Sequence, residues 1–141
     1  CVMKYLLDTC AISELVAKQP SEIVIDWIDN IDQESVYLSV ITIGEIRKGI
    51  EKLPDSKRKV NLQQWLNDEL RIRFRGKILA IDTDVMLVWG ELTGRLESEG
   101  KKMPAMDSLI AAIAIHNNCS LVTRNENDFK YAGLNIVNPW Q

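Results

Sequence analysis

Short apolar runs alternate with longer segments of helical periodicity along this 141-residue chain. The runs expected to form strands are residues 5–7, 36–39, 78–81, 121–123 and 136–137. In most of the segments between them, apolar residues recur every three or four positions, as on one face of a helix. Strands that alternate with helices predict βαβ units and a mostly parallel sheet with helices on both faces. We therefore expect a single α/β domain over residues 1–141.

The expected helices cover residues 11–18, 21–31, 42–50, 57–73, 85–98 and 109–115. Glu45 follows Thr42 at the spacing of a capping box, which predicts that a helix begins at Thr42. Ser21 and Asp82 are the predicted N-caps of two other helices. Because ligand sites in parallel sheets lie beyond the carboxyl ends of the strands, residues just after the apolar runs are the first candidates for a functional site.

Charge is unevenly distributed along the chain. The formal net charge of −3 argues mildly against a nucleic-acid partner, but residues 47–77 carry ten Lys or Arg and four Asp or Glu. Such a segment is either a solvated helix surface or a phosphate-binding face. The cysteines Cys1, Cys10 and Cys119 follow no zinc-site spacing, which favours a reduced, cytoplasmic protein. The apolar run 109–115 is too short to cross a bilayer, so no membrane association is expected.

Four acidic or amide residues lie beside the predicted element ends at widely separated points: Asp8, Glu45, Asp107 and Asn125. Each has an ordinary explanation by itself, as a helix cap, a turn or a surface charge. Independent caps have no reason to gather at one end of a sheet, however. Oxygen ligands from distant segments are what a hard cation such as Mg²⁺ requires, and a carboxylate-bound metal suits phosphodiester hydrolysis.

Other chemistries fit the sequence less well. His116, the only histidine, belongs to the apolar helix and is expected to be structural, so a Ser-His-Asp or Cys-His mechanism lacks support. Asp82-Thr83-Asp84 matches the start of a HAD-type phosphatase, whose first Asp is a nucleophile, but too little chain follows it. A receiver-type signalling module needs two adjacent acids after its first strand, where this chain has only Asp8.

Four phrases of sequence together carry a family resemblance: LLDT at 6–9, LSVITIGEI at 38–46, PAMDSLIAA at 104–112 and LVTRN at 121–125. In this order and at this spacing they closely resemble the PIN-domain ribonucleases. The nearest branch is that of the VapC and FitB-like toxins of type II toxin–antitoxin pairs. The resemblance runs from about Met3 to Trp140 and includes the ending Asn138-Pro139-Trp140.

The resemblance implies a three-layer α/β/α sandwich with Mg²⁺ or Mn²⁺ in an acidic pocket. The matched metal ligands are Asp8, Glu45 and Asp107. The fourth acidic position of the family falls on Asn125, whose amide oxygen can still ligate but carries no charge. Asp128, three residues along the chain, is the candidate to compensate for it.

The resemblance also implies roles for neighbouring residues. Cys10 stands where the family usually has Asn, which would alter the support around Asp8. Thr9 and Ser108 match positions that bind metal waters or phosphate. Arg124, or the basic segment 47–77, would hold the phosphates that flank the cleaved bond.

The function implied is that of a toxin, a Mg²⁺-dependent endoribonuclease that cleaves single-stranded or loop RNA such as that of tRNA. A small VapB-like antitoxin would neutralise it by filling the active-site groove, and the chain would form a homodimer. The alternative is a PIN-fold binding partner in an antitoxin and DNA-regulatory complex, with nuclease activity weakened or absent because of Asn125.

Overall fold

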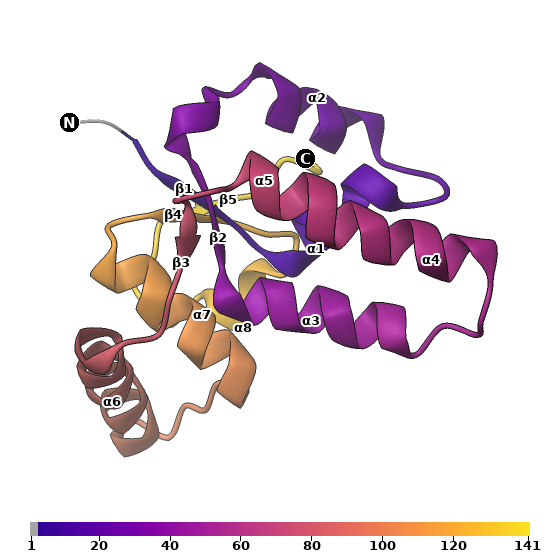
Figure 1. The fold of residues 1–141 in the computed structure, drawn as a ribbon. Helices are drawn as coiled ribbons and strands as arrows, with labels where there is room; N and C mark the ends of the chain where they lie inside the picture. Colours follow the sequence, from indigo (N-terminus) through magenta and orange to yellow (C-terminus); the bar gives the residue numbers. More distant parts are fainter. Residues whose placement is uncertain (1–2) are drawn as a thin grey trace.

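The computed structural model describes residues 3–141, so Cys1, one of the three cysteines considered above, lies outside the described residues. Five parallel strands form one central sheet (Figure 1). They are β1 (Tyr5–Leu7), β2 (Val36–Ser39), β3 (Ile78–Leu79), β4 (Ser120–Val122) and β5 (Ile136–Val137). Their spatial order is β3-β2-β1-β4-β5. The chain therefore builds outward from β1 in both directions, and the topological switch point lies between β1 and β4.

Helices cover both faces of this sheet (Figure 1). One face packs against α1 (Thr9–Ser13), α2 (Glu22–Asn30), α3 (Val40–Glu51) and the succession α4 (Lys57–Gln64), η3 (Trp65–Leu70) and α5 (Arg71–Arg73). The other packs against α6 (Thr83–Ser98), α7 (Ala105–His116) and α8 (Glu126–Phe129). Two single turns, η1 (Glu14–Val16) and η2 (Gln33–Ser35), precede α2 and β2. The predicted α/β/α sandwich is confirmed.

Successive strand residues supply the two cores, because their side chains point to opposite faces. Leu6 and Leu121 contact the α6–α7 side, whereas Leu7 and Val122 contact the α1–α3 side, and all four are fully buried. Fully burying one such side chain contributes about 1.5–3 kcal/mol. This double burial fixes the register of β1 against β4, where Leu6 pairs with Leu121 and Leu7 with Val122.

The helix after β2 begins earlier than predicted. The Ser39 hydroxyl accepts a hydrogen bond from the Thr42 backbone N–H at 3.1 Å, and α3 starts at Val40. The predicted capping box of Thr42 and Glu45 is therefore wrong, because Ser39 takes the capping role. As a result Thr42 is buried and Glu45 lies one turn inside the helix.

Other element ends also differ from the predicted ones, and α7 begins at Ala105 rather than at residue 109. The first helix begins at Thr9 with Asp8 as its N-cap, and η1 ends at Val16 rather than at residue 18. Asp82 caps α6 as predicted, accepting from the Val85 N–H at 2.9 Å. The predicted helix 57–73 contains the π-helical stretch η3. Within residues 3–141, no helix is both long and apolar enough to cross a membrane.

Candidate metal centre at the carboxyl edge of the sheet

Asp8 lies at the switch point between the two central strands. Its backbone N–H donates to the Val122 carbonyl at 2.9 Å, which continues the β1–β4 pairing by one residue. Its side chain is 7% exposed and both carboxylate oxygens accept hydrogen bonds: Oδ1 from the Thr9 N–H and Oδ2 from the Thr123 hydroxyl, each at 2.8 Å. Asp8 is thus a helix cap, as its position by itself suggested, and also a carboxylate fixed at the sheet edge.

Thr123 is a site residue that the sequence analysis missed. It is fully buried, and its hydroxyl donates to Asp8 while accepting from the Asn125 N–H at 3.1 Å. The thiol of Cys10 lies 3.6 Å from the same hydroxyl and 3.7 Å from Asp8 Oδ2. The available sequence indication was its position, since Thr123 follows β4 as Asp8 follows β1.

Replacing Thr123 by valine tests this hydrogen-bonded connection. Valine keeps the shape but leaves the Asp8 Oδ2 atom and the Asn125 N–H without their shared partner. We expect the free energy of unfolding to fall by about 1–3 kcal/mol, the usual effect of orphaning buried polar groups. Denaturant unfolding of Thr123→Val measures it, with Thr93→Val on α6 as the matched control; equal losses in the two variants would contradict the connection.

Glu45 reaches the same edge from α3. The Thr9 hydroxyl donates to Glu45 Oε1 at 2.5 Å and is also hydrogen-bonded to the Thr42 hydroxyl at 3.0 Å. Thr9 therefore binds two acids at once, Asp8 through its backbone N–H and Glu45 through its side chain. The predicted role of Thr9 toward phosphate or metal-bound water stays a prediction.

Asp107 belongs to α7 and contributes to the same edge. It is the third residue of this helix and not its N-cap, which was one of the two roles predicted for it. Burial, followed by the charges of Asp128, Asp8 and Glu45 in that order, raises the pKa of its carboxyl to about 6. Like charges raise a carboxyl pKa in this way only when they lie near it. The structure therefore brings together the three predicted metal ligands and adds Asp128.

The raised pKa of Asp107 predicts a pH dependence of stability in metal-free protein. A folded-state pKa of about 6, against an ordinary value of 3.8, means that the folded chain binds this proton more tightly than the unfolded chain. The contribution of Asp107 to stability is then lost as the pH rises from about 4 to about 6. We expect Asp107→Asn to gain in melting temperature relative to the wild type across that range in EDTA. Parallel curves, like those expected for the exposed control Asp68→Asn, would contradict this.

Asn125 and Asp128 occupy different parts of the short helix α8. Asn125 is the exposed residue before its first turn, and its side chain makes no capping hydrogen bond. Asp128 lies three residues later, one turn along, and it is the first of the three charges that act on Asp107. Among the described residues, the fourth negative charge at this edge thus comes from Asp128.

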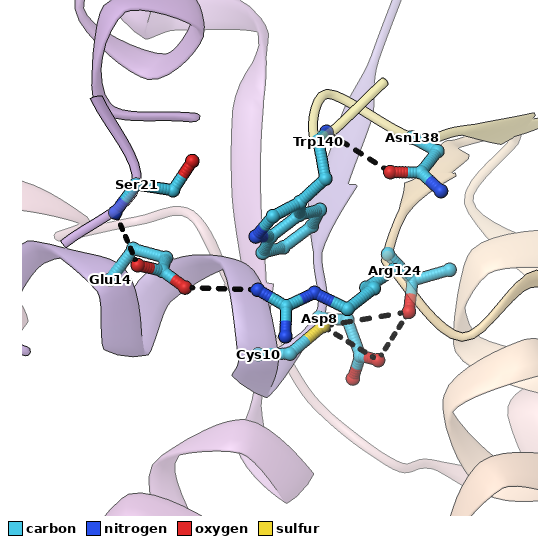
Figure 2. Close-up of polar contacts among 8 residues, drawn as sticks. Asp8, Cys10, Glu14, Ser21, Arg124, Asn138 and Trp140 are labelled. Carbon is cyan, nitrogen blue, oxygen red and sulfur yellow. Dashed lines mark hydrogen bonds and ion pairs between the residues drawn. The ribbon is translucent and has the colours of Figure 1, made fainter. Parts of the chain in front are cut away.

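Ser108 and Arg124 both have hydrogen-bond or ion-pair partners within the protein, and their predicted roles toward phosphate or metal-bound water stay predictions. The buried Ser108 hydroxyl donates to the Ala105 carbonyl at 2.7 Å and accepts from the Trp89 indole N–H at 2.9 Å, so it joins α7 to α6. Arg124 pairs with Glu14 at 3.3 Å and lies over the Trp140 ring, 4.6 Å from its centroid (Figure 2). Glu14 in turn accepts from the Ser21 N–H at 2.8 Å.

Two open hollows flank the acidic edge. One, of about 530 Å³, lies beside Glu45 between α3 and the start of α7, and Lys48, Lys52 and Met106 line it. The other, of about 540 Å³, lies beside Asp128 and also contains Arg124. Several cations of the basic segment 47–77 have structural partners instead: Arg47 with Glu51, Lys59 with Asp55 and Lys77 with Glu34.

A second group of metal-ligand side chains lies apart from this edge. Asp82, Asp84 and His116 are exposed, and one ligand atom of each lies within 4.8 Å of the others. His116 ends α7 at the surface rather than lying in the core. The acids of the candidate site are spaced more widely than this group, as mutual repulsion favours.

The donor set at the acidic edge fits a hard divalent cation. It offers carboxylate oxygens from four segments that are distant in sequence. Burial, and then repulsion by the charges of Asp128, Asp8 and Glu45, disfavours the charged form of Asp107 and raises its pKa. A cation relieves that repulsion, and oxygen ligands suit Mg²⁺ or Mn²⁺. The residues present therefore fit such an ion.

A family model described as PIN domain matches residues 5–134, so this chain belongs to the PIN-domain family. It is 36% identical to the VapC ribonuclease Y4jK of Sinorhizobium fredii over 136 residues, 96% of this chain and 97% of the relative. It is also 36% identical to the toxin FitB of Neisseria gonorrhoeae over 135 residues, again 96% and 97% of the two chains. The solved structure of FitAB bound to the IR36 DNA fragment superposes with a TM-score of 0.92 at 35% identity, covering 97% of this chain and 96% of that one.

Proposed function

We propose that this chain is the toxin of a toxin–antitoxin pair and acts as a Mg²⁺-dependent endoribonuclease on single-stranded or loop RNA in the cytoplasm. The observation that carries the proposal is the convergence of Asp8, Glu45, Asp107 and Asp128 on the carboxyl edge of a PIN-domain sheet. The relatives named ribonuclease and toxin support the reaction and the biological role.

The protein side of the reaction follows from the contacts of these acids. Asp8, Glu45 and Asp107 would hold the ion, with Asp128 as the fourth carboxylate in place of Asn125. Bound there, Mg²⁺ supplies Lewis-acid activation of the scissile phosphate and of the attacking water. Thr9 and Thr123 hold Asp8 from both of its oxygens, so that this carboxylate does not turn when substrate binds.

Cations beside the acids would position the RNA backbone. Lys48 and Lys52 line the hollow that contains Glu45, and no ion pair occupies either of them within residues 3–141. Phosphates that flank the cleaved bond would therefore lie along this side of α3.

Purified antitoxin-free protein incubated with total cellular RNA tests the activity. Discrete fragments are expected in Mg²⁺ or Mn²⁺ and none in EDTA, with Asp8→Asn as the inactive control. Asparagine also caps helices well, so the α1 start is preserved. Cleavage that survives EDTA, or that persists in Asp8→Asn, would contradict the proposal.

A groove that leads to the acids suits the proposed antitoxin. Val16, Leu62 and Trp65 line an apolar hollow between η1 and α4, and the same residues line a second hollow that reaches Thr9 and Glu45. A VapB-like antitoxin segment lying in this groove would cover the candidate metal centre. Coexpression of this chain with its antitoxin should yield a complex that does not cleave RNA. Leu62→Asp should weaken that complex and release active nuclease.

The proposed assembly also includes a homodimer, which light scattering of the purified chain tests by its mass.

The second candidate function, a binding partner with little nuclease activity, has one observation in its favour, the neutral Asn125 at the family's fourth acidic position. Folded protein that forms the antitoxin complex but leaves RNA uncut in both Mg²⁺ and Mn²⁺ would support that alternative.

A further inference from the structure

The hollow beside Asp128 has a composition unlike that of a phosphate site. Asn125 and Asn127 contribute exposed amides, and Asp128 and Glu126 contribute negative charge. The only cation among its lining residues is Arg124, which is already paired with Glu14. Net negative charge repels a phosphate. Amides, by contrast, carry both donors and acceptors and match the edges of nucleobases.

Arg124 supplies a flat surface at this hollow. Its guanidinium lies against the Trp140 ring and is tied by Glu14, so its orientation is set from two sides (Figure 2). The side chain is nevertheless 56% exposed. With one face against Trp140, that exposure leaves surface of the guanidinium plane open toward solvent. Bases of single-stranded RNA stack on planes of this kind.

Trp140 is itself held in place by the hollow's own residues. Its backbone N–H donates to Asn138 Oδ1 at 3.0 Å (Figure 2). The Asn138 amide in turn donates to Glu126 Oε2 at 2.9 Å. Asn138 and Glu126 are thus engaged in positioning Trp140, which leaves the side-chain amides of Asn125, Asn127 and Gln141 available to a ligand. A stacking plane and these amides therefore adjoin Asp128, a member of the acidic edge.

We propose that this hollow is a nucleobase subsite: one unpaired base of the RNA, next to the cleaved phosphodiester, stacks on Arg124 while Asn125 or Asn127 hydrogen-bonds its edge. The proposal rests on the ribonuclease function above and deepens it, because it assigns base selectivity to one side of the acidic edge. Lys48 and Lys52, which would bind phosphates of the RNA backbone, lie in the hollow on the other side of the acids. The RNA strand would therefore cross the acids between the two hollows.

Two hollow variants with matched controls test the subsite. Arg124→Lys keeps the charge but loses the plane, and Arg95→Lys is its control, because Arg95 is a comparably exposed arginine that pairs with Glu99 on α6. Asn127→Ala removes one amide, and the exposed Asn67→Ala of η3 is its control. All four are compared with the wild type on an RNA pool with a randomised single-stranded loop in Mg²⁺.

Sequencing of the fragment ends should show a base preference at one position beside the cut. We expect Arg124→Lys to lower cleavage of the preferred RNA by about tenfold, the loss typical of one stacked base, and Asn127→Ala to reduce the base preference, while the two controls change neither quantity. Hydrolysis of a small abasic ribose phosphodiester, which has no aromatic ring to stack on Arg124, should stay within about twofold of wild type in every variant. A wild-type pattern without any preference, or a preference unchanged in both hollow variants, would overturn the subsite.

Failure of the ribonuclease function is separable from failure of the subsite. If the wild type cuts neither RNA nor the small diester, the function has failed, and the subsite is then tested by fluorescence polarisation of labelled RNA octamers of each base in Mg²⁺. An octamer that binds about tenfold more weakly to Arg124→Lys, and equally to Arg95→Lys, supports the subsite. Equal binding of all octamers, or loss only of antitoxin affinity in the hollow variants, overturns it.

Discussion

Asp107→Asn is expected to reduce metal-dependent RNA cleavage on the order of a thousandfold, because loss of a metal-ligand charge removes several kcal/mol of transition-state stabilisation. The same change should leave the fold intact, since Asp107 is only partly buried and lies on the third residue of a helix whose cap is elsewhere. It also removes the crowded carboxyl whose pKa is raised to about 6.

Asp107→Asn is expected to lose RNA cleavage without losing stability, and a variant that merely unfolds the protein would not show this combination. Metal-free Asp107→Asn should be at least as stable as the wild type near neutral pH, while its cleavage of RNA is lost. Single-turnover cleavage and thermal unfolding in EDTA measure the two quantities on one preparation. Asp84→Asn, in the separate exposed group on α6, is the matched control and should retain full activity. Activity retained in Asp107→Asn would contradict the site.

Asp128→Asn is expected to weaken Mg²⁺ affinity or cleavage by about 10–100-fold, the usual loss when a group that supports a metal site is removed. Asn125→Ala should stay within about twofold of wild type, as exposed positions usually do. The difference follows from position, because the charge of Asp128 acts on Asp107 whereas Asn125 is neutral and contributes its backbone N–H to Thr123.

A readout independent of catalysis accompanies this comparison. Removing the Asp128 charge should lower the pKa of Asp107 from about 6, since Asp128 is the first of the charges that raise it. Nuclear magnetic resonance of the Asp107 carboxyl follows this titration in metal-free protein. If Asn125→Ala proves more damaging than Asp128→Asn, the fourth position of the site belongs to the Asn125 amide, as the family resemblance implied.

The fold could be predicted because the three inner strands, β1, β2 and β4, are short and largely buried runs, and this pattern does not depend on where each helix begins. The start of α3 could not be predicted, because Ser39 and Thr42 are both residue types that cap helices, and each could accept a hydrogen bond from the backbone N–H three residues later. What decides between them is tertiary: Thr42 is buried against Thr9, which leaves Ser39 free to cap.

The site residues that directly follow a strand could be predicted from the sequence, whereas those placed by a turn of the chain could not. Asp8 follows β1 directly, so its place at the sheet edge follows from the pattern. Asp128 reaches the same edge only because α8 forms a helical turn after Asn125, and residues three apart share a helix face. Thr123 was missed because a buried hydroxyl has no distinct pattern in an apolar run.

The proposed function requires one divalent-cation site made by Asp8, Glu45, Asp107 and Asp128, and calorimetric titration of metal-free protein with Mn²⁺ tests this site most directly. The wild type and Asp84→Asn are expected to bind Mn²⁺ alike, while Asp8→Asn and Asp107→Asn lose that binding. Binding that persists in Asp8→Asn and Asp107→Asn, but disappears in Asp84→Asn, would place the ion at Asp82, Asp84 and His116 instead and would contradict the account.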